Sequence, residues 1–189
     1  MTAENIAFRI AGGHRPPLQL YGMTSTVLPP DLKPEPRNPS QIIDFLENTK
    51  WADTLSHKEV EVLSGYFRLY TAEKGSVIVS EGSREIYLCL LVDGEVRIVK
   101  QGDREAAKSL GSVGPGKTFG EMSLIDGEPR SASIIAEEAT TLLVLTGDDF
   151  QRLSSEVPRL AIKVLLKISK LLSQRLRQTT GALLNHLGG

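Results

Sequence analysis

The middle of the chain alternates apolar and polar positions with a period of two, in short runs separated by glycine-containing turns. Such runs predict β-strands whose successive side chains point to opposite faces of a sheet. Turn-forming segments such as Asp93-Gly94 and Gly114-Pro115-Gly116 separate the runs. We predict strands at residues 76–80, 86–92, 96–100, 109–113, 132–136 and 141–146. Many short strands with frequent glycine turns are typical of a β-sandwich or a jelly-roll barrel.

A helical period precedes the strand region. Ser40 can cap a short helix that runs to about Asn48. Ser56 and Glu59 form a capping-box pattern, which predicts the start of a second helix. The apolar face of this second helix is expected to consist of Val60, Leu63 and Phe67.

The helical pattern returns at Asp148 and predicts a long helix over residues 159–186, with Pro158 in its first turn. Residues 157–189 contain six Lys or Arg and no Asp or Glu, so they carry +6 while the rest of the chain carries −7. A heptad seam can be drawn through Leu165, Leu172, Leu176, Thr179 and Leu183. The seam fits either a helix that pairs with a second copy or a helix that folds back on its own domain.

Residues 1–39 hold seven of the ten prolines and show neither period. This composition predicts an extended arm. Apolar patches near Phe8 and Tyr21 leave two alternatives open, a disordered tail or an arm that docks on its own domain or on a partner. The chain therefore divides into an arm at 1–39, a β-domain with N-terminal helices at 40–158, and a long helix at 159–189.

The most informative chemistry lies in residues 119–133, which read FGEMSLIDGEPRSAS. Glu121 can accept a hydrogen bond from a ribose 2′-hydroxyl. Arg130 offers a planar fork of donors that matches two phosphate oxygens. The small residues around them let backbone N–H groups approach the same anion. The alternative is a hairpin turn in which Glu121 and Arg130 form an ordinary surface ion pair.

This segment resembles the phosphate-binding cassette of the cyclic-nucleotide-binding domain family, in Phe119-Gly120-Glu121 and Arg130-Ser131-Ala132 above all. That family includes bacterial catabolite activators and kinase regulatory subunits, and the resemblance covers roughly residues 40–186. It implies a mainly β fold, an eight-stranded jelly-roll β-barrel with N-terminal helices and a long C-terminal helix. It also implies a ligand site formed by Phe119, Gly120, Glu121, Met122, Ser123, Arg130, Ser131 and Ala132. Ser123 is expected to permit the close turn, with direct contact open.

A second resemblance lies in the long helix, where Arg175-Leu176 precede Thr179 and Thr180. In activators of this family, an Arg-Leu-x-x-Thr-Ser segment contacts the adenine base. The resemblance therefore implies that Thr179 and Thr180 contact the base. Their hydroxyls can donate to a ring nitrogen or accept from an exocyclic amine. The alternative is that the two threonines mark the fraying end of the helix before Gly181.

Other function classes are poorly supported by the residues present. The related barrel of cupin-type metal enzymes needs clustered ligands, whereas the three histidines, His14, His57 and His186, lie far apart in sequence, and no nucleophile–histidine constellation is evident. We therefore expect no catalytic residue, no metal and no enzyme. Activators of the family continue into a helix-turn-helix domain, whereas this chain ends at Gly189, so we expect no sequence-specific DNA binding.

The sequence thus predicts a stand-alone sensor of a cyclic nucleotide, with cyclic AMP expected and cyclic GMP open. Its output would be a protein partner, reached by repositioning the long helix, with a homodimer through that helix as a further expectation. The alternatives are a transcription-regulator-like protein that binds nucleic acid through its basic helix, and a scaffold without ligand. The single cysteine, Cys89, and the absence of a signal-peptide pattern or a membrane-length apolar run predict a cytoplasmic protein without membrane insertion.

Overall fold

The computed structural model describes residues 27–102 and 107–187. Residues 1–26, which form most of the predicted arm, lie outside the described residues. The remainder of the arm is built into the fold, because β1 (Lys33–Pro34) pairs antiparallel with β2 (Arg68–Ala72), and Leu32 is buried. This part of the arm was expected to contain no strand. A two-residue strand is too short to leave a periodic pattern in the sequence.

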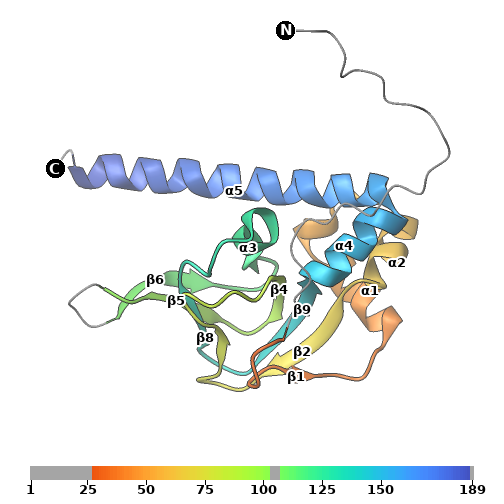
Figure 1. Ribbon diagram of the computed structural model, residues 1–189, viewed down its shortest axis with the longest axis horizontal. Helices are drawn as coiled ribbons and strands as arrows, with labels where there is room; N and C mark the ends of the chain where they lie inside the picture. The colour runs from red at the N-terminus through yellow and green to blue at the C-terminus, as the bar shows by residue number, and fades with distance from the viewer. Residues whose placement is uncertain (1–26, 103–106, 188–189) are drawn as a thin grey trace, which may run out of the picture.

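The β-strands form two antiparallel sheets (Figure 1). The first has the order β1-β2-β9-β4-β7 and the second the order β3-β8-β5-β6. The six predicted strands are confirmed within one residue at each end, as β3 (Val77–Val79), β4 (Tyr87–Asp93), β5 (Val96–Lys100), β6 (Lys108–Val113), β8 (Ser133–Ala136) and β9 (Thr140–Thr146). β7 (Thr118–Phe119) was not predicted. The mainly β, jelly-roll-like arrangement is confirmed, although the two sheets do not close into a single barrel.

The continuous apolar run of β4 is explained by burial on both faces of its sheet. Leu88 and Leu90 pack in a core with the helices, whereas Tyr87, Cys89 and Leu91 pack in a second core between the two sheets. Successive side chains of β4 therefore point into different cores, so the period of two is kept although both faces are apolar. The aromatic side chain of Tyr87 is therefore wholly buried in the second core.

Two short helices and a 3-10 turn precede β2. α1 (Pro39–Glu47) is capped by the side chain of Asn38, not by Ser40 as predicted, and η1 (Lys50–Ala52) follows it. The predicted capping box of Ser56 and Glu59 is confirmed at the start of α2 (His57–Ser64). Phe67 is buried but does not lie on this helix, because α2 ends at Ser64 and the chain turns into β2.

Two helices follow the strands, α4 (Gly147–Glu156) and α5 (Pro158–Leu187). Figure 1 shows α5 crossing the length of the molecule on the side of the sheets where α3 (Glu121–Asp126) lies. The residues of the predicted heptad seam have different surroundings in the two halves of α5. Leu165 and Leu172 pack against the helical core, whereas Leu176 and Leu183 are 68% and 56% exposed. The first half of α5 thus belongs to its own domain, and the second half offers an apolar surface.

Candidate functional site

The FGE segment forms a sharp turn between β7 and α3, and Gly120 is the residue that makes the turn possible. Its φ is +78°, in the left-handed region that favours glycine. A Cβ at this position would lie 2.7 Å from Nη1 of Arg130 and 2.8 Å from the Tyr87 carbonyl oxygen. Glycine is therefore required both by the backbone angle and by the close approach of Arg130.

Arg130 is 5% exposed and is held by the backbone on two sides. Its Nη1 donates to the Gly120 carbonyl at 2.8 Å, and its Nη2 donates to the Tyr87 carbonyl at 2.9 Å. The guanidinium also lies over the Tyr87 ring, 4.1 Å from the ring centroid. Nε is buried and has no hydrogen-bond partner among the described residues. A buried cation whose Nε–H is unpaired is suited to an anion that would complete its pairing.

Glu121 is 2% exposed, so it is not the exposed partner of a surface ion pair. Its Oε1 accepts a hydrogen bond from Arg175 of α5, which also donates to the Thr118 carbonyl. Its Oε2 is buried without a partner among the described residues. Burial raises the pKa of Glu121, and the nearby Arg175 and Arg130 guanidiniums oppose that shift. The carboxylate thus has one oxygen fixed by α5 and one available to a hydroxyl donor.

Arg175 is a site residue that the sequence reasoning missed. It was counted with the basic face of the long helix, and its 54-residue separation from Glu121 gives no sign of the contact. The available signal was its position in the Arg-Leu-x-x-Thr segment, where only the threonines were assigned a role.

The end of the cassette is held by a lysine from the neighbouring strand. Lys100 Nζ donates to the Ser131 carbonyl at 2.6 Å and pairs with Glu81 Oε1 at 2.9 Å. Glu81 is held in turn by the Gln101 N–H at 2.9 Å. In a trans peptide the C=O and the next N–H point in opposite directions. Fixing the Ser131 carbonyl therefore fixes the direction of the Ala132 N–H, which is one of the expected phosphate donors.

The other expected cassette residues have structural surroundings that the sequence did not show. Phe119 is buried in the core between the sheets, and Met122 is 50% exposed. Ser123 is buried, and its hydroxyl donates to the Gly120 carbonyl at 3.2 Å, which closes the turn. Ser131 is exposed at the surface. The roles of these residues toward a ligand stay predictions.

Thr179 and Thr180 lie one turn beyond Arg175 and are both exposed. The Thr180 hydroxyl donates to the Leu176 carbonyl at 2.9 Å within its own helix. In the part of the chain that the structure describes, neither threonine is hydrogen-bonded to the cassette. The structure therefore brings together Gly120, Glu121 and Arg130, but not the two threonines. Contact of the threonines with a base stays a prediction.

A cavity of about 610 Å³ lies beside the cassette, under α5, and is called the α5 cavity below. Phe119, Thr118 and Arg175 connect it to the cassette turn. Its volume lies within the range of about 300–1,000 Å³ that is usual for small-ligand sites. The other lining residues are Lys50, Trp51, Asp53, Ile98, Ser112, Val113, Gly116, Lys117, Lys167, Leu171, Gln174 and Gln178. The side chains include four cations and one carboxylate, and two of the cations, Lys167 and Arg175, are paired with Asp53 and Glu121.

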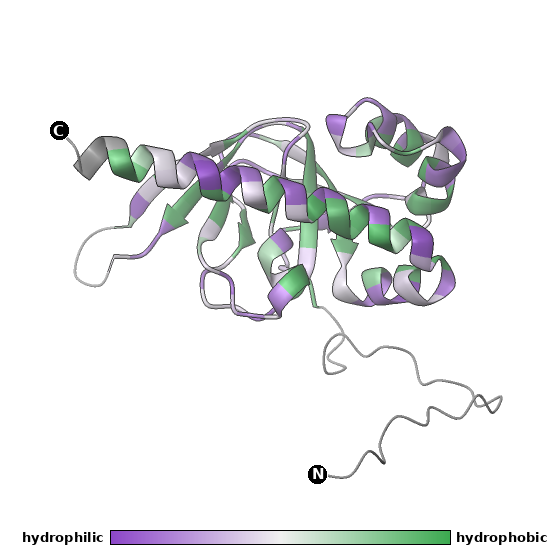
Figure 2. Ribbon diagram, turned by 90° about the horizontal axis from the view of Figure 1, so that it is seen from above, coloured by the Kyte–Doolittle hydropathy of each residue, from purple (hydrophilic) through white to green (hydrophobic). Residues whose placement is uncertain are grey.

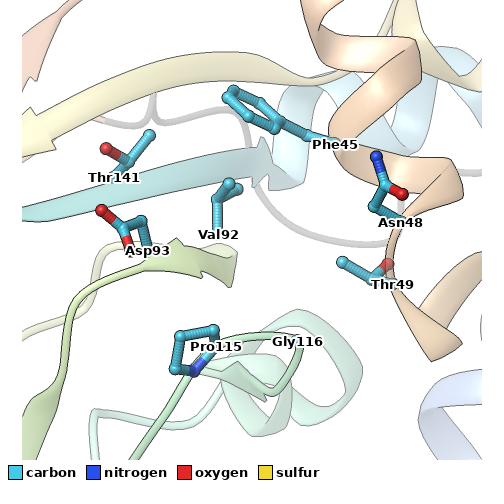
Figure 3. Close-up of a pocket in the computed structure, with 8 residues that line it drawn as sticks. All are labelled: Phe45, Asn48, Thr49, Val92, Asp93, Pro115, Gly116 and Thr141. Carbon is cyan, nitrogen blue, oxygen red and sulfur yellow. The ribbon is translucent and has the colours of Figure 1, made fainter.

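A second cavity, of about 520 Å³, lies between the end of α1 and the turn before β7 (Figure 3). Phe45 and Asn48 approach it from α1, and Pro115 from the turn. Its one charged side chain is the Asp93 carboxylate. A cavity with a carboxylate and no cation is unsuited to a phosphate, so the α5 cavity and the cassette are the better candidate site.

Within residues 27–102 and 107–187, no group of three His, Cys, Asp or Glu side chains gathers in a way that could hold a metal ion. Over the same residues, no helix is both long enough and apolar enough to cross a membrane.

A family model described as a cyclic nucleotide-binding domain matches residues 69–156. The Cyclic AMP receptor protein of Thermus thermophilus is 35% identical over 124 residues, which is 66% of this chain and 56% of that protein. The crystal structure of the Thermus thermophilus catabolite activator protein has a TM-score of 0.62 and 34% identity, over 70% of this chain and 61% of that one.

A crystal structure of a cyclic nucleotide-binding domain from Methylobacillus flagellatus matches over nearly the whole length. It has a TM-score of 0.74 and 32% identity, and the match covers 92% of this chain and 97% of that one. The chain spans about half or less of the curated relatives it matches, 56% of the Thermus protein and 24% of a cyclic nucleotide-gated potassium channel from Mesorhizobium japonicum. The fold, the cassette and these matches together show that the chain belongs to the cyclic nucleotide-binding domain family.

Proposed function

We propose that this protein is a cyclic AMP sensor that binds its ligand through the cassette and transmits the binding event through α5. The observation that carries the proposal is the contact between Glu121 and Arg175. Through it, the carboxylate expected to hold the ribose also holds the helix expected to move. A ligand that changes the hydrogen bonds of Glu121 therefore changes the anchoring of α5, which is the differential contact that a population shift requires.

The cassette supports binding of a cyclic phosphate because its buried polar atoms are incompletely paired. Arg130 supplies the opposite charge that offsets the free-energy cost of removing a phosphate from water. The Arg130 Nε and the Glu121 Oε2 are both buried without partners in the described structure. One is a donor suited to a phosphate oxygen, and the other is an acceptor suited to a ribose hydroxyl. The backbone N–H groups of Ser131 and Ala132 complete the proposed phosphate contacts.

The purine is proposed to be adenine, with guanine as the alternative. The Thermus thermophilus relative is a cyclic AMP receptor protein by name, and it is 35% identical over the matched region. The cassette itself contacts only the sugar and the phosphate, which cyclic AMP and cyclic GMP share. The choice between them therefore rests on the residues around the base, and it is settled by competition between the two nucleotides.

The output is proposed to be a protein contact made by the second half of α5. Figure 2 shows hydrophobic and hydrophilic residues interleaved along this helix. Leu176, Leu183 and Leu184 are 68%, 56% and 65% exposed, which leaves apolar side chains for a partner or for a second copy of the chain. A homodimer through this surface and a separate effector protein are both consistent with it.

Sequence-specific binding of nucleic acid is the less favoured function for the basic helix α5. Lys163 pairs with Glu59 at 2.6 Å, Lys167 pairs with Asp53 at 2.6 Å, and Arg175 pairs with Glu121. Half of the six basic side chains of α5 are thus already neutralised by the domain beneath them. Any binding to DNA is expected to be weak, independent of sequence and lost at moderate salt.

The remaining parts of the proposal concern the cell and the domain. The β-domain with its N-terminal helices is proposed to span 40–158, which contains the matched residues 69–156, and the long helix to span 159–189. The matched family is defined by ligand binding, and we propose no catalytic step. A cytoplasmic location is proposed because cyclic nucleotides act as intracellular signals.

Hydrogen exchange tests the proposed coupling. Saturating cyclic AMP should lower amide exchange in residues 159–183 of the wild-type chain, because the ligand fixes the Glu121–Arg175 contact. 5′-AMP, which lacks the cyclic phosphate, serves as the control ligand. Arg175→Met should still bind cyclic AMP but should lose the protection in α5. Protection of α5 that is unchanged by cyclic AMP would count against coupling even if the nucleotide binds.

A further inference from the structure

A smaller cavity, of about 230 Å³, lies apart from the cassette and is called the β2 cavity below. Residues of β2 line it together with Pro34 of β1, Ile42 of α1 and Arg152 of α4. Figure 1 shows α1 and α4 at the opposite end of the molecule from the C-terminus of α5. None of the described residues that line the β2 cavity lines the α5 cavity or belongs to the cassette, so a ligand here would be separate from the proposed nucleotide.

The inner side of the β2 cavity is apolar. Ile42, Phe67 and Leu69 line it and are buried in the core with the helices. Tyr70, which is half-buried, adds a second aromatic side chain. These side chains suit a flat apolar group, because the transfer of such a group from water to an apolar wall is favourable. The cavity is smaller than the range of about 300–1,000 Å³ that is usual for drug-sized ligands, so the group that it accepts must be small.

Three guanidinium groups from separate segments meet at the β2 cavity. Arg37 precedes α1, Arg68 lies on β2 and Arg152 lies on α4. One acceptor brings two of them together, because the Gly65 carbonyl accepts from Nη2 of Arg37 at 3.2 Å and from Nη2 of Arg152 at 3.1 Å. Two like charges held side by side repel each other, and an anion beside them offsets that repulsion. The arrangement therefore favours an anionic ligand.

The carboxylates nearby neutralise only part of this positive charge. Asp149 lies 3.2 Å from Arg152 and 3.8 Å from Arg68. Glu156 lies 3.9 Å from Arg152, which is therefore paired twice. Glu35 is the one carboxylate among the described lining residues, and its Oε1 accepts from a threonine hydroxyl of β2 at 2.9 Å.

Arg37 and Arg68 keep donors that a ligand can use. Within the described residues, Arg37 has no carboxylate within 4 Å, and the one hydrogen bond of its side chain is to the backbone carbonyl of Gly65. The guanidinium of Arg68 makes no hydrogen bond to a described residue, since its contact with Asp149 is 3.8 Å long. The fork of donors on a guanidinium matches the two oxygens of a carboxylate.

We infer that the β2 cavity binds a small organic acid, whose carboxylate is held by Arg37 and Arg68. The flat apolar body of the acid lies against Phe67 and Tyr70. A bare inorganic anion is a poorer ligand, because it would leave the apolar wall in contact with water. The cavity is thus a second ligand site, independent of the proposed nucleotide site.

The test is an NMR titration of the isotope-labelled full chain with benzoate, followed through the arginine Nε–H signals and the backbone amides of β2. A ligand of this size should bind with a dissociation constant of about 1 mM. Benzylamine has the same ring with the opposite charge, and inorganic phosphate has no ring, so each should bind at least about tenfold more weakly. Benzoate should bind equally well in the presence of saturating cyclic AMP, because the two sites share no described residue.

Arg37→Leu and Arg68→Leu should each weaken benzoate binding by about tenfold or more, because each removes charge-assisted hydrogen bonds to the carboxylate. Both side chains are exposed, so both variants should fold and should bind cyclic AMP as the wild type does. Arg97→Leu is the matched control, because Arg97 pairs with Glu137 outside the β2 cavity and should leave benzoate binding unchanged. The inference is overturned if wild type does not bind benzoate, if binding survives both cavity variants, if benzylamine or phosphate binds as tightly, or if cyclic AMP displaces benzoate.

Discussion

Replacement of Arg130 by lysine tests whether the guanidinium supports the fold as well as the ligand. Arg130 spans two backbone carbonyls, those of Gly120 and Tyr87, and stacks on the Tyr87 ring. A lysine ammonium is a point charge on a flexible stem, so it can reach one carbonyl but cannot span both with the same geometry. Arg130→Lys should therefore leave one buried carbonyl without a donor.

The magnitude follows from the contacts that are lost. A buried carbonyl left unpaired costs about 1–3 kcal/mol. Loss of the guanidinium from the face of the buried Tyr87 ring costs about 1 kcal/mol more. We expect Arg130→Lys to lower the free energy of unfolding by about 2–4 kcal/mol. Nucleotide affinity should fall by a further amount of about 2–4 kcal/mol, because the fork that fits two phosphate oxygens is lost.

Urea denaturation without ligand measures the first effect, and calorimetry with cyclic AMP on the folded variant measures the second. The denaturation midpoint should fall by about 1–2 M while the slope is unchanged. Arg97→Lys is the matched control, because Arg97 forms an exposed ion pair with Glu137 at 2.8 Å and should change stability by less than about 0.5 kcal/mol. Equal midpoints for Arg130→Lys and wild type would refute the structural role, and equal affinities would remove Arg130 from the ligand site.

Three further predictions concern the partners of the ligand. Glu121→Gln should weaken binding of cyclic AMP more than that of 2′-deoxy-cyclic AMP, because only the first presents the hydroxyl; calorimetry that shows equal losses would contradict the ribose role. Burial raises the pKa of Glu121, so the folded protein takes up this proton more readily than the unfolded chain. As pH falls through the raised value, this group should favour folding while the ribose acceptor is lost, so cyclic AMP affinity should fall on acidification. Titrations at several pH values check this, and the Glu121 contribution should be absent in Glu121→Gln. Lys100→Met should weaken cyclic AMP by about 1 kcal/mol, because the Ser131 carbonyl loses its donor, whereas the exposed control Lys74→Met should not; identical calorimetric affinities would contradict a positioning role.

The strands could be predicted from the sequence because their pattern is local. The period of two and the glycine turns determine where β4 and β5 begin and end, whatever they pair with. β2 was not predicted because Phe67, just before it, continues the apolar spacing of the preceding helix. The strand conformation of β2 depends instead on its pairing with β9, about 70 residues later in the sequence. The capping box could be recognised in the sequence because its two residues, Ser56 and Glu59, are only three positions apart.

The cassette could be predicted in composition but not in its contacts. The motif indicated that Gly120, Glu121 and Arg130 act together, and the structure places them around one turn. No local pattern indicated that Arg130 would donate to the Tyr87 carbonyl, 43 residues away, or that Arg175 would reach Glu121. Such pairings are set by how α5 and β4 pack across the domain, and no local spacing encodes them.

Calorimetric titration of the purified wild-type chain with cyclic AMP, alongside 5′-AMP, tests the central claim most directly. The cyclic phosphate is a compact monoanion that can be enclosed by Arg130 and the cassette backbone, whereas 5′-AMP carries an open phosphate with more charge to bury. The account predicts saturable binding of one cyclic AMP per chain, and binding of 5′-AMP that is far weaker. Absence of binding by both cyclic AMP and cyclic GMP, or equal affinity for 5′-AMP, would contradict it.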